Sequence, residues 1–496
     1  MEKNNEKTDA YYASNLPRVP EIIYIVNISA NVGGELAEAV VEGDKIFLAD
    51  HQGVYALNRS DGALIWGVEV YSGTLEGRAI SYPQPLAKWR ALGLMRFVEA
   101  YGIGKYLYIG TSSSAGEQDA YLIALDKDNG NLIWKVKLES EAPTEPSKVT
   151  SNLIVADGKI YVGSVSDAGY IYCVSEDGVL KWRSRTEANV RGLAHGDGIL
   201  FSTSEASKKL YALNSNTGEK QWVFEHNAML STPSYKNGKL FLADSQGNIL
   251  AVSKEGKLIW KKSLGISSDV NTNSYIAVSN RSIYAVRGIG ERPRNLYILN
   301  FDGTLIGNYT FEKEENGGRP LASEDVVIVP VKDGYNKIYL LWGGSVKLSE
   351  FKLIEKEIWT PKVSVGYGEI YVVANPTTLI KLADYKKPVV KLEKVELNKT
   401  LNINAIACDK ESALHKVLLV YSINGSKWNY REMEVSRKYA IQPIGGYGFA
   451  EELYGIKINI QPEAINSTVE FYIAAIDNSG NYETTGNYAY RITIRH

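Results

Sequence analysis

The stretch YALNSNTGEKQW (Tyr211–Trp222) ends one short apolar run, turns on Asn-Thr-Gly and enters a second run that carries a tryptophan. The chain contains the same phrase again in close and looser forms. The other copies are VYALNRSDGALIW at 54–66, LIALDKDNGNLIW at 122–134, IYCVSEDGVLKW at 171–182 and ILAVSKEGKLIW at 249–260. Self-similarity at about 40 residues, built only from strand patterns, predicts the blades of a β-propeller.

Each repeat contains four short strand patterns. Around the opening phrase we expect strands at 189–194, 199–203, 209–214 and 220–225. Gly218 supplies a positive φ at low cost in the turn, and Asn216 tolerates the left-handed region. The tryptophan sits on the outermost strand, where it can bury ~150–250 Å² between neighbouring blades. Five residues are assigned this docking role: Trp66, Trp134, Trp182, Trp222 and Trp260.

Later repeats become less regular. Residues 283–307 give a sixth blade with Gly307 at the tryptophan position, and residues 326–354 give a degenerate seventh. Residues 359–384 supply only three strands of an eighth blade, whereas EIIYIVNIS at 21–29 precedes the first full one. Pairing this N-terminal strand with the last blade would remove two exposed edges. We therefore predict an all-β, eight-bladed propeller that is closed by an N-terminal strand.

The repeats ALNSNTGEKQW, ALNRSDGALIW and ALDKDNGNLIW resemble the tryptophan-docking motif of the PQQ-like, or quinoprotein-dehydrogenase-like, propellers. The resemblance covers about 21–384. It is specific for the fold but not for a function, because this family contains both enzymes and non-catalytic scaffolds, a lipoprotein of bacterial outer-membrane assembly among them.

The docking phrase stops at DYKKP (384–388), and the rest of the chain reads as a second all-β unit. Alternating strand patterns include VVKLEKVEL, LNINAIAC, KVLLVYSIN, INSTVEFYIAAID and YAYRITIRH. Their lengths and turns predict an immunoglobulin- or fibronectin-like β-sandwich. The expected domains are a polar tether at 1–20, the propeller at 21–387 and the sandwich at 388–496.

Bulk composition argues against several function classes. The formal net charge of -2 gives no general attraction to nucleic acid or anionic membrane, and no apolar run is long enough to span a bilayer. The cysteines Cys173 and Cys408 fall in different predicted domains and form neither a disulfide framework nor a zinc site. Few Cys and Met residues with 33 Tyr suit a thermophile.

No catalytic set is recognisable in the sequence. The family resemblance implies one enzyme hypothesis, a PQQ-dependent dehydrogenase that holds its quinone with calcium, but the adjacent cysteine pair that many such enzymes carry is missing. Calcium ligands converging from distant blades stay open as an alternative, as do paired carboxylates acting on carbohydrate. The C-terminal turn at Asp477, Asn478 and Asn481 reads as a turn rather than a calcium site. We expect no resident cofactor or metal.

Candidate binding residues come from propeller geometry. The innermost strands begin at one face, near the central channel, with the residues Glu35, Arg96, Lys148, Arg191, Thr232, Asn271, Arg319 and Lys362. Five of these are basic, and we call Arg96, Lys148, Arg191, Arg319 and Lys362 the basic ring. It would favour an anionic ligand or an acidic peptide. The alternative is a neutralised surface, because nearby loops offer Asp50, Asp119, Asp167, Glu205, Asp244 and Asp333.

The long insertion at 72–91 is expected over the same face. Tyr82, Trp89 and Arg90 give it the composition of an interface hot spot, although Trp89 could instead be a core residue. The loop at 288–295 adds Arg292 and Arg294.

The N-terminus, MEKNNEKTDAYYASNLPRVP, does not read as a signal peptide, so the protein is either cytoplasmic or lacks a leader or anchor in this sequence. Seven Asn-x-Ser/Thr sequons favour export; they lie at Asn27, Asn58, Asn280, Asn308, Asn398, Asn424 and Asn466. We therefore expect a non-enzymatic, extracellular or cell-surface scaffold that binds protein partners and no nucleic acid. The alternatives are a PQQ- or carbohydrate-acting enzyme with its site in the propeller funnel and a ligand-sensing ectodomain.

Overall fold

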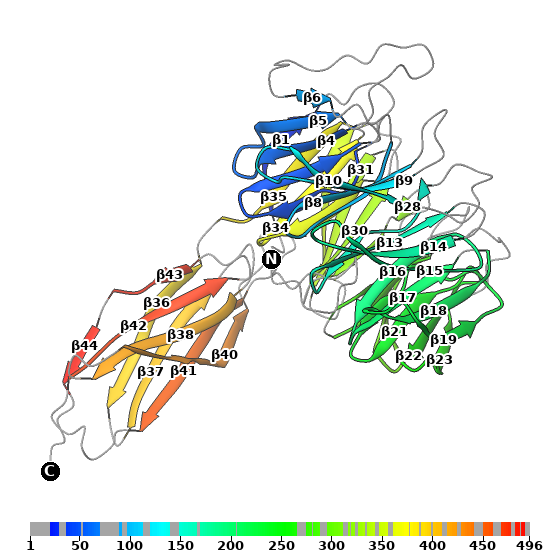
Figure 1. Cartoon of the computed structure of the whole chain (residues 1–496). Coiled ribbons are helices and arrows are strands. Elements are labelled where there is room, and N and C mark those ends of the chain that lie inside the picture. Colours follow the sequence, from blue (N-terminus) through cyan, green and yellow to red (C-terminus); the bar gives the residue numbers. More distant parts are fainter. Residues whose placement is uncertain are drawn as a thin grey trace. The chain divides into compact units, whose positions relative to one another are not determined.

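The structure of the 496-residue chain is a computed structural model. It describes residues 20–28, 36–50, 53–69, 89–91, 97–112, 120–138, 148–165, 169–204, 206–264, 274–279, 281–287, 295–310, 316–317, 319–322, 326–332, 335–342, 347–355, 361–375, 377–385, 388–397, 400–408, 414–423, 428–440, 450–459, 468–477, 482–486 and 488–491. Within these ranges the secondary structure is β-strand, without a helix. The chain divides into two compact units (Figure 1), here the repeat unit, mainly Ile23–Gly366 and Ile370–Lys381, and the C-terminal unit, mainly Leu382–His496.

The first two sheets of the repeat unit are antiparallel apart from one parallel pair, β5 and β6. The first sheet contains β2 (Val40–Glu42), β3 (Lys45–Ala49), β4 (Gly53–Asn58), β5 (Leu64–Glu69) and β6 (Trp89–Ala91). The next, nine-stranded sheet contains β7 (Phe97–Ile103), β8 (Leu107–Ser112), β9 (Ala120–Leu125), β10 (Leu132–Leu138), β11 (Lys148–Val149), β12 (Ile154–Ala156), β13 (Lys159–Val165), β14 (Gly169–Ser175) and β15 (Leu180–Arg185). In this sheet β11 pairs with both β8 and β13, and so joins two successive groups of strands.

Three four-stranded sheets follow, each in simple chain order. The opening phrase belongs to β16 (Val190–Gly196), β17 (Ile199–Ser204), β18 (Lys209–Asn214) and β19 (Lys220–Glu225). The next two sheets are β20 (Ser234–Lys236), β21 (Lys239–Ala243), β22 (Asn248–Ser253) and β23 (Leu258–Ser263), then β24 (Ser274–Val278), β25 (Ile283–Arg287), β26 (Asn295–Leu299) and β27 (Leu305–Thr310). The four strands predicted around the opening phrase are confirmed to within two residues.

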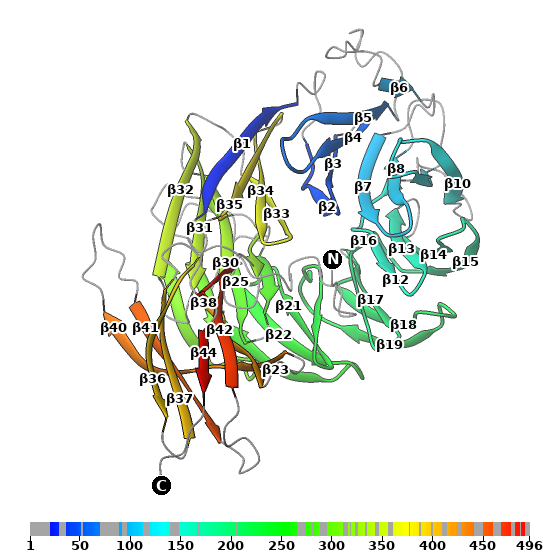
Figure 2. The same ribbon diagram turned by 90° about the vertical axis from the view of Figure 1, so that its left-hand side faces the viewer.

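The last two sheets of this unit include the N-terminal strand. One contains β28 (Asn316–Gly317), β29 (Leu321–Ala322), β30 (Val326–Lys332), β31 (Tyr335–Trp342) and β32 (Lys347–Glu355). The other has the order β1 (Glu21–Asn27), β35 (Thr378–Ala383), β34 (Glu369–Asn375) and β33 (Lys362–Gly366), so that β1 runs beside strands about 350 residues later in the chain (Figure 2).

The outer strands carry a β-bulge just before the tryptophan position. In β19, Trp222 lies opposite Ala212 while Lys220 lies opposite Leu213, so Gln221 is the extra residue. Equivalent register shifts occur in β5, β10, β15, β23 and β27. The bulge places Trp222 on the same face as Ala212, and both belong to one apolar cluster shared with the next sheet.

The C-terminal unit has two sheets around one core. The first contains β36 (Val389–Leu397), β37 (Thr400–Cys408), β40 (Glu434–Ala440) and β41 (Ala450–Asn459), and the second contains β38 (Leu414–Ile423), β39 (Asn429–Glu432), β42 (Thr468–Asp477), β43 (Tyr482–Thr484) and β44 (Tyr488–Arg491). Ile403 and Ala405 of the first sheet share a buried cluster with Leu419, Phe471 and Ile473 of the second. Strands β39, β40, β41 and β43 are not among the five strand patterns named from the sequence.

Candidate interaction surfaces

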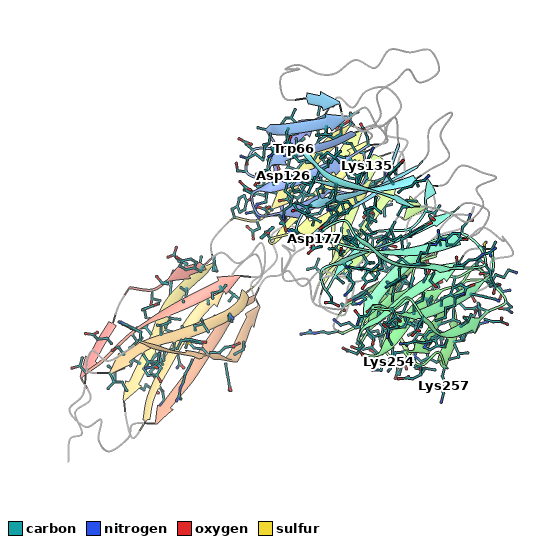
Figure 3. All side chains as sticks on the ribbon, viewed as in Figure 1. Trp66, Asp126, Lys135, Asp177, Lys254 and Lys257 are labelled. Carbon is teal, nitrogen blue, oxygen red and sulfur yellow. The ribbon has the colours of Figure 1, made fainter. Side chains whose placement is uncertain are left out.

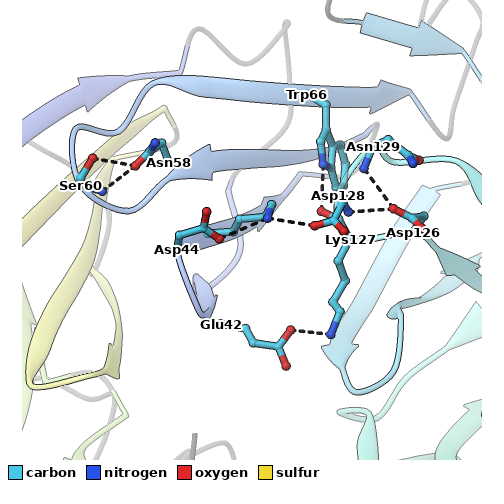
Figure 4. Close-up of polar contacts among 10 residues, drawn as sticks. Glu42, Asp44, Asn58, Ser60, Trp66, Asp126, Lys127, Asp128 and Asn129 are labelled. Atoms are coloured by element: carbon cyan, nitrogen blue, oxygen red, sulfur yellow. Dashed lines mark hydrogen bonds and ion pairs between the residues drawn. The ribbon is translucent and has the colours of Figure 1, made fainter.

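The repeat tryptophans form one contact that recurs from sheet to sheet. The Nε1 of Trp222 donates a hydrogen bond to the carbonyl oxygen of Lys254, in the turn of the next sheet, at 2.8 Å. The same contact joins Trp66 to Lys127, Trp134 to Glu176, Trp182 to Ser215 and Trp260 to Phe301, at 2.9–3.2 Å. A polar indole nitrogen that is buried needs such a partner. Figure 4 shows the contact for Trp66, and Figure 3 labels Trp66 and Asp126 among the described side chains.

The turn glycine lies under the tryptophan of the preceding sheet. Gly256 has φ +83°, and a Cβ atom there would lie 2.7 Å from Cδ2 of Trp222. Gly218 has φ +75° and the same relationship with Trp182. The glycine is therefore required both by backbone conformation and by the space that the indole occupies. The sequence pattern indicated only the first reason.

Strand β1 makes the equivalent contact with a different side chain. The Tyr24 hydroxyl donates to the carbonyl oxygen of Arg59 at 3.2 Å, and Arg59 holds the same turn position as Lys127. The buried amine of Lys381 donates to the same oxygen at 2.9 Å and lies 5.6 Å from the centre of the Tyr24 side chain. A Cβ atom at Gly62 would meet Val26 first and Cε2 of Tyr24 at 3.0 Å, so this turn glycine also lies under β1. Tyr24 thus occupies the position that tryptophan has in the repeats.

One repeat replaces the tryptophan contact by another aromatic pair. In β27, Gly307 holds the position where tryptophan is expected, and it lies opposite Ile298 of β26. Two residues later, the Tyr309 side chain packs 5.8 Å from that of Tyr339 in the following sheet. The aromatic residue that packs between these two sheets therefore lies two residues further along β27 than the usual tryptophan position.

Ion pairs connect the same turns at the protein surface. Lys127 contacts Glu42 at 2.6 Å and Lys45 contacts Asp128 at 2.9 Å, both between the first two groups of strands (Figure 4). Lys254 pairs with Asp197 at 3.0 Å further along the chain. The Lys254–Asp197 pair is exposed on both sides, and exposed pairs of this kind contribute ~0–1 kcal/mol each.

The basic ring is only partly described. Lys148 is the first residue of β11, Arg191 the second of β16 and Lys362 the first of β33, while Arg319 precedes β29 by two residues. Arg191, Arg319 and Lys362 have half-buried side chains. The Lys362 amine donates to the carbonyl oxygen of Leu36 at 2.8 Å, which fastens it to the neighbouring sheet. Arg96 lies outside the described residues, as does the side chain of Lys148.

Two of the acids that might neutralise this surface are instead buried in their own loops. Asp244 accepts hydrogen bonds from Asn248, from the backbone N of Gln246 and from Nε2 of His226, at 2.8–3.0 Å. Asp50 accepts bonds from the backbone N of Gly53 and from the Tyr55 hydroxyl. Asp119, Asp167, Glu205 and Asp333 lie outside the described residues. The two described acids therefore act as loop-capping groups.

The electrostatics of Asp244 follow from this environment. Burial by itself raises the pKa of the Asp244 carboxyl, but the hydrogen bonds from His226 and Asn248 outweigh that effect and hold the pKa below its ordinary value. Because His226 follows β19 and Asp244 follows β21, the pair also links two sheets. The sequence signal for both loop caps is the shared LAD-x-Gln-Gly pattern at 48–53 and 242–247.

The last three residues of the long insertion form a strand that the sequence did not predict. Trp89–Ala91 form β6, which pairs in parallel with β5 on the outer edge of the first sheet, with Gly67 opposite Trp89. These three residues thus extend the outer edge of the first sheet, where the otherwise unpaired edge of β5 offers backbone hydrogen bonds. The placement of the insertion over the same propeller face stays a prediction. Tyr82, Arg292 and Arg294 lie outside the described residues, as do the side chains of Trp89 and Arg90.

Several other predicted sites can be placed only in part. Asn308 is exposed on β27, and Asn58 accepts hydrogen bonds from the backbone N and the hydroxyl of Ser60, whereas Asn27 ends β1. Asn280, Asn398, Asn424 and Asn466 are not among the described residues.

Burial raises the pKa of the Cys173 thiol to about 12. Among the described residues, no three His, Cys, Asp or Glu side chains gather as a metal site would require.

In the part of the chain that the structure describes, no helix is long and apolar enough to cross a bilayer.

Comparisons with known proteins agree with this architecture. The family described as outer membrane protein assembly factor BamB matches residues 118–319. The BamB of Moranella endobia is 25% identical over 377 residues, which covers 66% of this chain and 89% of that protein. A tetrathionate hydrolase of Acidithiobacillus ferrooxidans is 27% identical over 222 residues, covering 43% of this chain but only 39% of the hydrolase.

The solved structure of BamB from Moraxella catarrhalis has a TM-score of 0.51 at 15% identity, covering 74% of this chain and all of the other. At that identity the likeness concerns the fold alone. The recurring tryptophan contacts, the matched repeats and the shared fold together support assignment of the repeat unit to the PQQ-like β-propeller family.

Proposed function

We propose that this protein is a non-enzymatic, exported or cell-surface scaffold that binds other proteins. Its platform is an eight-bladed propeller closed by β1, and its C-terminal unit is an immunoglobulin- or fibronectin-like sandwich. The function rests on one observation: the chain aligns with 89% of a relative that is named as an assembly factor.

The blade count is supported by the sheet topology. If the nine-stranded sheet is counted as two blades that β11 joins, the sheets of the repeat unit make eight. Closure is supported by two contacts, the pairing of β1 with β35 and the Tyr24–Arg59 hydrogen bond, which repeats the tryptophan contact of the other blades.

A propeller whose blades are fixed to one another suits a protein that binds partners without catalysing a reaction. The five tryptophan contacts fix each of the first five blades to the next, so loops at the ends of these blades are presented in a defined arrangement. We place the partner site at the basic ring, with Arg191 and Arg319 as its best-described members. The partner expected there is an acidic protein segment, because a guanidinium group can bind a carboxylate in bidentate geometry.

Charge reversal tests this assignment. Cross-linking mass spectrometry of the tagged protein in its own cells identifies partners, and the Arg191→Glu/Arg319→Glu variant should lose them. The matched control is Arg183→Glu/Arg185→Glu on the exposed edge strand β15, which should retain them. Equal partner recovery from both variants places the site elsewhere, and an absence of specific partners for the wild type contradicts the scaffold.

Export is tested by measuring whether the protein carries glycans. Intact mass of the protein from its native source should exceed the polypeptide mass by whole hexose-containing units, with Asn308 as the best-exposed described acceptor. A bare polypeptide mass together with recovery from the cytoplasm contradicts this part of the proposal.

An enzyme is the second candidate, favoured by the similarity to tetrathionate hydrolase. Incubation of the purified protein with tetrathionate, and separately with PQQ, calcium and a dye acceptor, tests it directly. Turnover in either assay would replace the scaffold as the primary function.

A further inference from the structure

The outward face of one sheet in the C-terminal unit carries an unusual group of exposed aromatic side chains. Trp428 is 43% exposed, Tyr430 74% and Tyr482 63%. Three large aromatic residues exposed on one small unit are costly in water, and such patches mark binding sites. Nothing in the proposed scaffold function uses them.

The strand register places these residues on a common face. Along β38 and β42, Leu419, Phe471 and Ile473 are fully buried in the core, so the alternate residues Val420 and Tyr472 face outward. Tyr430 lies opposite Val420, and Val420 lies opposite Tyr472, in one row across β39, β38 and β42. On the same face, Tyr482 lies opposite Ile476. We call Trp428, Tyr430, Val420, Tyr472, Ile476 and Tyr482 the aromatic face.

Two members of the aromatic face pack against each other before any ligand arrives. The Trp428 side chain packs against Tyr472 with centroids 5.7 Å apart and an interplanar angle of 48°. Tyr430 and Tyr472 stand two strand spacings apart, about 10 Å. Tyrosine and tryptophan offer large contact area at a low cost in conformational entropy, so little ordering is needed on binding.

Carboxylates border the aromatic residues. Glu432 follows Tyr430 by two residues, and Glu470 precedes Tyr472 by two, so both share the outward face and both are exposed. Carboxylate oxygens accept hydrogen bonds from hydroxyl groups and repel phosphates. Lys416 also faces outward, opposite Ile476, so the carboxylates set the charge only at the Tyr430–Tyr472 end of the face. A ligand for that end has flat apolar surfaces flanked by hydroxyl donors and carries no negative charge.

We propose that the aromatic face binds a neutral polysaccharide. The apolar faces of the pyranose units stack on Tyr430 and on the Trp428–Tyr472 pair, and their hydroxyl groups donate to Glu432 and Glu470. The spacing of about 10 Å corresponds to two sugar units of an extended chain that crosses the strands. Glycan binding here would be independent of the protein partners of the repeat unit.

Affinity electrophoresis and calorimetry of the full-length protein test this proposal with defined probes. The probes are soluble polymers and hexasaccharides of β-1,4-linked glucose, mannose and N-acetylglucosamine. We expect binding to at least one, with a loss of about tenfold or more for Tyr430→Ala and Trp428→Ala, which corresponds to about 1.4 kcal/mol. Tyr430→Phe should stay within a few-fold of the wild type, because stacking needs the aromatic side chain and not its hydroxyl.

Val435→Ala is the matched control, since Val435 is 44% exposed on the other sheet of the same unit. It should bind as the wild type does, and unchanged thermal unfolding of Tyr430→Ala confirms that the fold is intact. Failure to bind every probe overturns the proposal, as does binding that Tyr430→Ala and Trp428→Ala leave intact. A dimer in solution that Tyr430→Ala dissociates, without glycan binding, would show instead that the face binds a second copy of the chain.

Discussion

Trp222 packs on Gly256 of the next repeat and not on Gly218 of its own turn. The glycine and the tryptophan of each repeated phrase therefore contact different neighbours. The glycine packs under the tryptophan of the preceding repeat, and the tryptophan packs on the glycine of the following repeat. A single repeat cannot satisfy either contact, which explains why the phrase occurs in series.

Trp222→Phe should lower the free energy of unfolding by ~1 kcal/mol, because it removes the hydrogen bond to Lys254 while keeping most of the apolar contact. Trp222→Ala should cost ~3–5 kcal/mol through the cavity it leaves. Urea denaturation followed by circular dichroism measures both. Val223→Ala, at a neighbouring residue that is 42% exposed, is the control and should change stability little. Equal effects of all three substitutions would contradict the docking role.

Gly256→Ala should destabilise the protein more than Gly238→Ala. Both glycines have positive φ, at +83° and +72°, so both substitutions incur the cost of the left-handed conformation, ~1–2 kcal/mol. Only Gly256 has a tryptophan where the new methyl group would lie; nothing lies within 4 Å at Gly238. The difference in unfolding free energy isolates the steric contact, and no difference would mean that backbone conformation alone requires the glycine.

Tyr24→Phe should lower stability by ~1 kcal/mol through loss of the hydrogen bond to Arg59. Ile25→Ala on the same strand is the control, because Ile25 is 55% exposed. Hydrogen exchange of β35 amides should also become faster in Tyr24→Phe if β1 closes the propeller. Unchanged exchange would show that Tyr24 does not hold the strand in place.

Asp244 should make stability depend on pH in the acid range. Its pKa in the folded protein lies below the ordinary value of 3.8, so its contribution is present above that value and is lost as the pH falls through the folded pKa. Unfolding free energies between pH 3 and pH 7 should therefore fall less steeply on acidification in Asp244→Asn than in the wild type. If the unfolding free energies of the wild type and Asp244→Asn fall in parallel on acidification, Asp244 is not the source of the pH dependence.

Cys173 should resist thiol reagents in the folded protein. Its side chain is fully buried, and burial raises its pKa to about 12, so almost no thiolate exists at pH 8. In a Cys408→Ser background, a chromogenic disulfide reagent should report reaction only on addition of denaturant. Rapid labelling under native conditions would show that this sheet opens locally.

The sequence alone was sufficient for the regular repeats. Asn-Thr-Gly at 216–218 predicts a tight turn through glycine and asparagine chemistry, and the apolar runs around it predict strands 209–214 and 220–225, both of which are confirmed. These features are local, because turn residues and alternating side chains act over a few positions.

Features that depend on a neighbouring strand were not predictable in this way. The pairing of β6 with β5, the loop caps around Asp50 and Asp244, and the row from Tyr430 to Tyr472 all require a register between distant segments. A shift of one residue in any strand would send its side chains to the other face.

By itself, the sequence determined the β-repeat architecture, its turns and the tryptophans that join its sheets, because those signals recur at a fixed period. Only the tertiary structure decided that each glycine serves the preceding tryptophan, that Tyr24 takes the tryptophan role in β1, and that aromatic residues from three strands share one outward face. The physical reason is that these contacts join residues far apart in the chain, and their partners are set by strand register and packing rather than by local conformation.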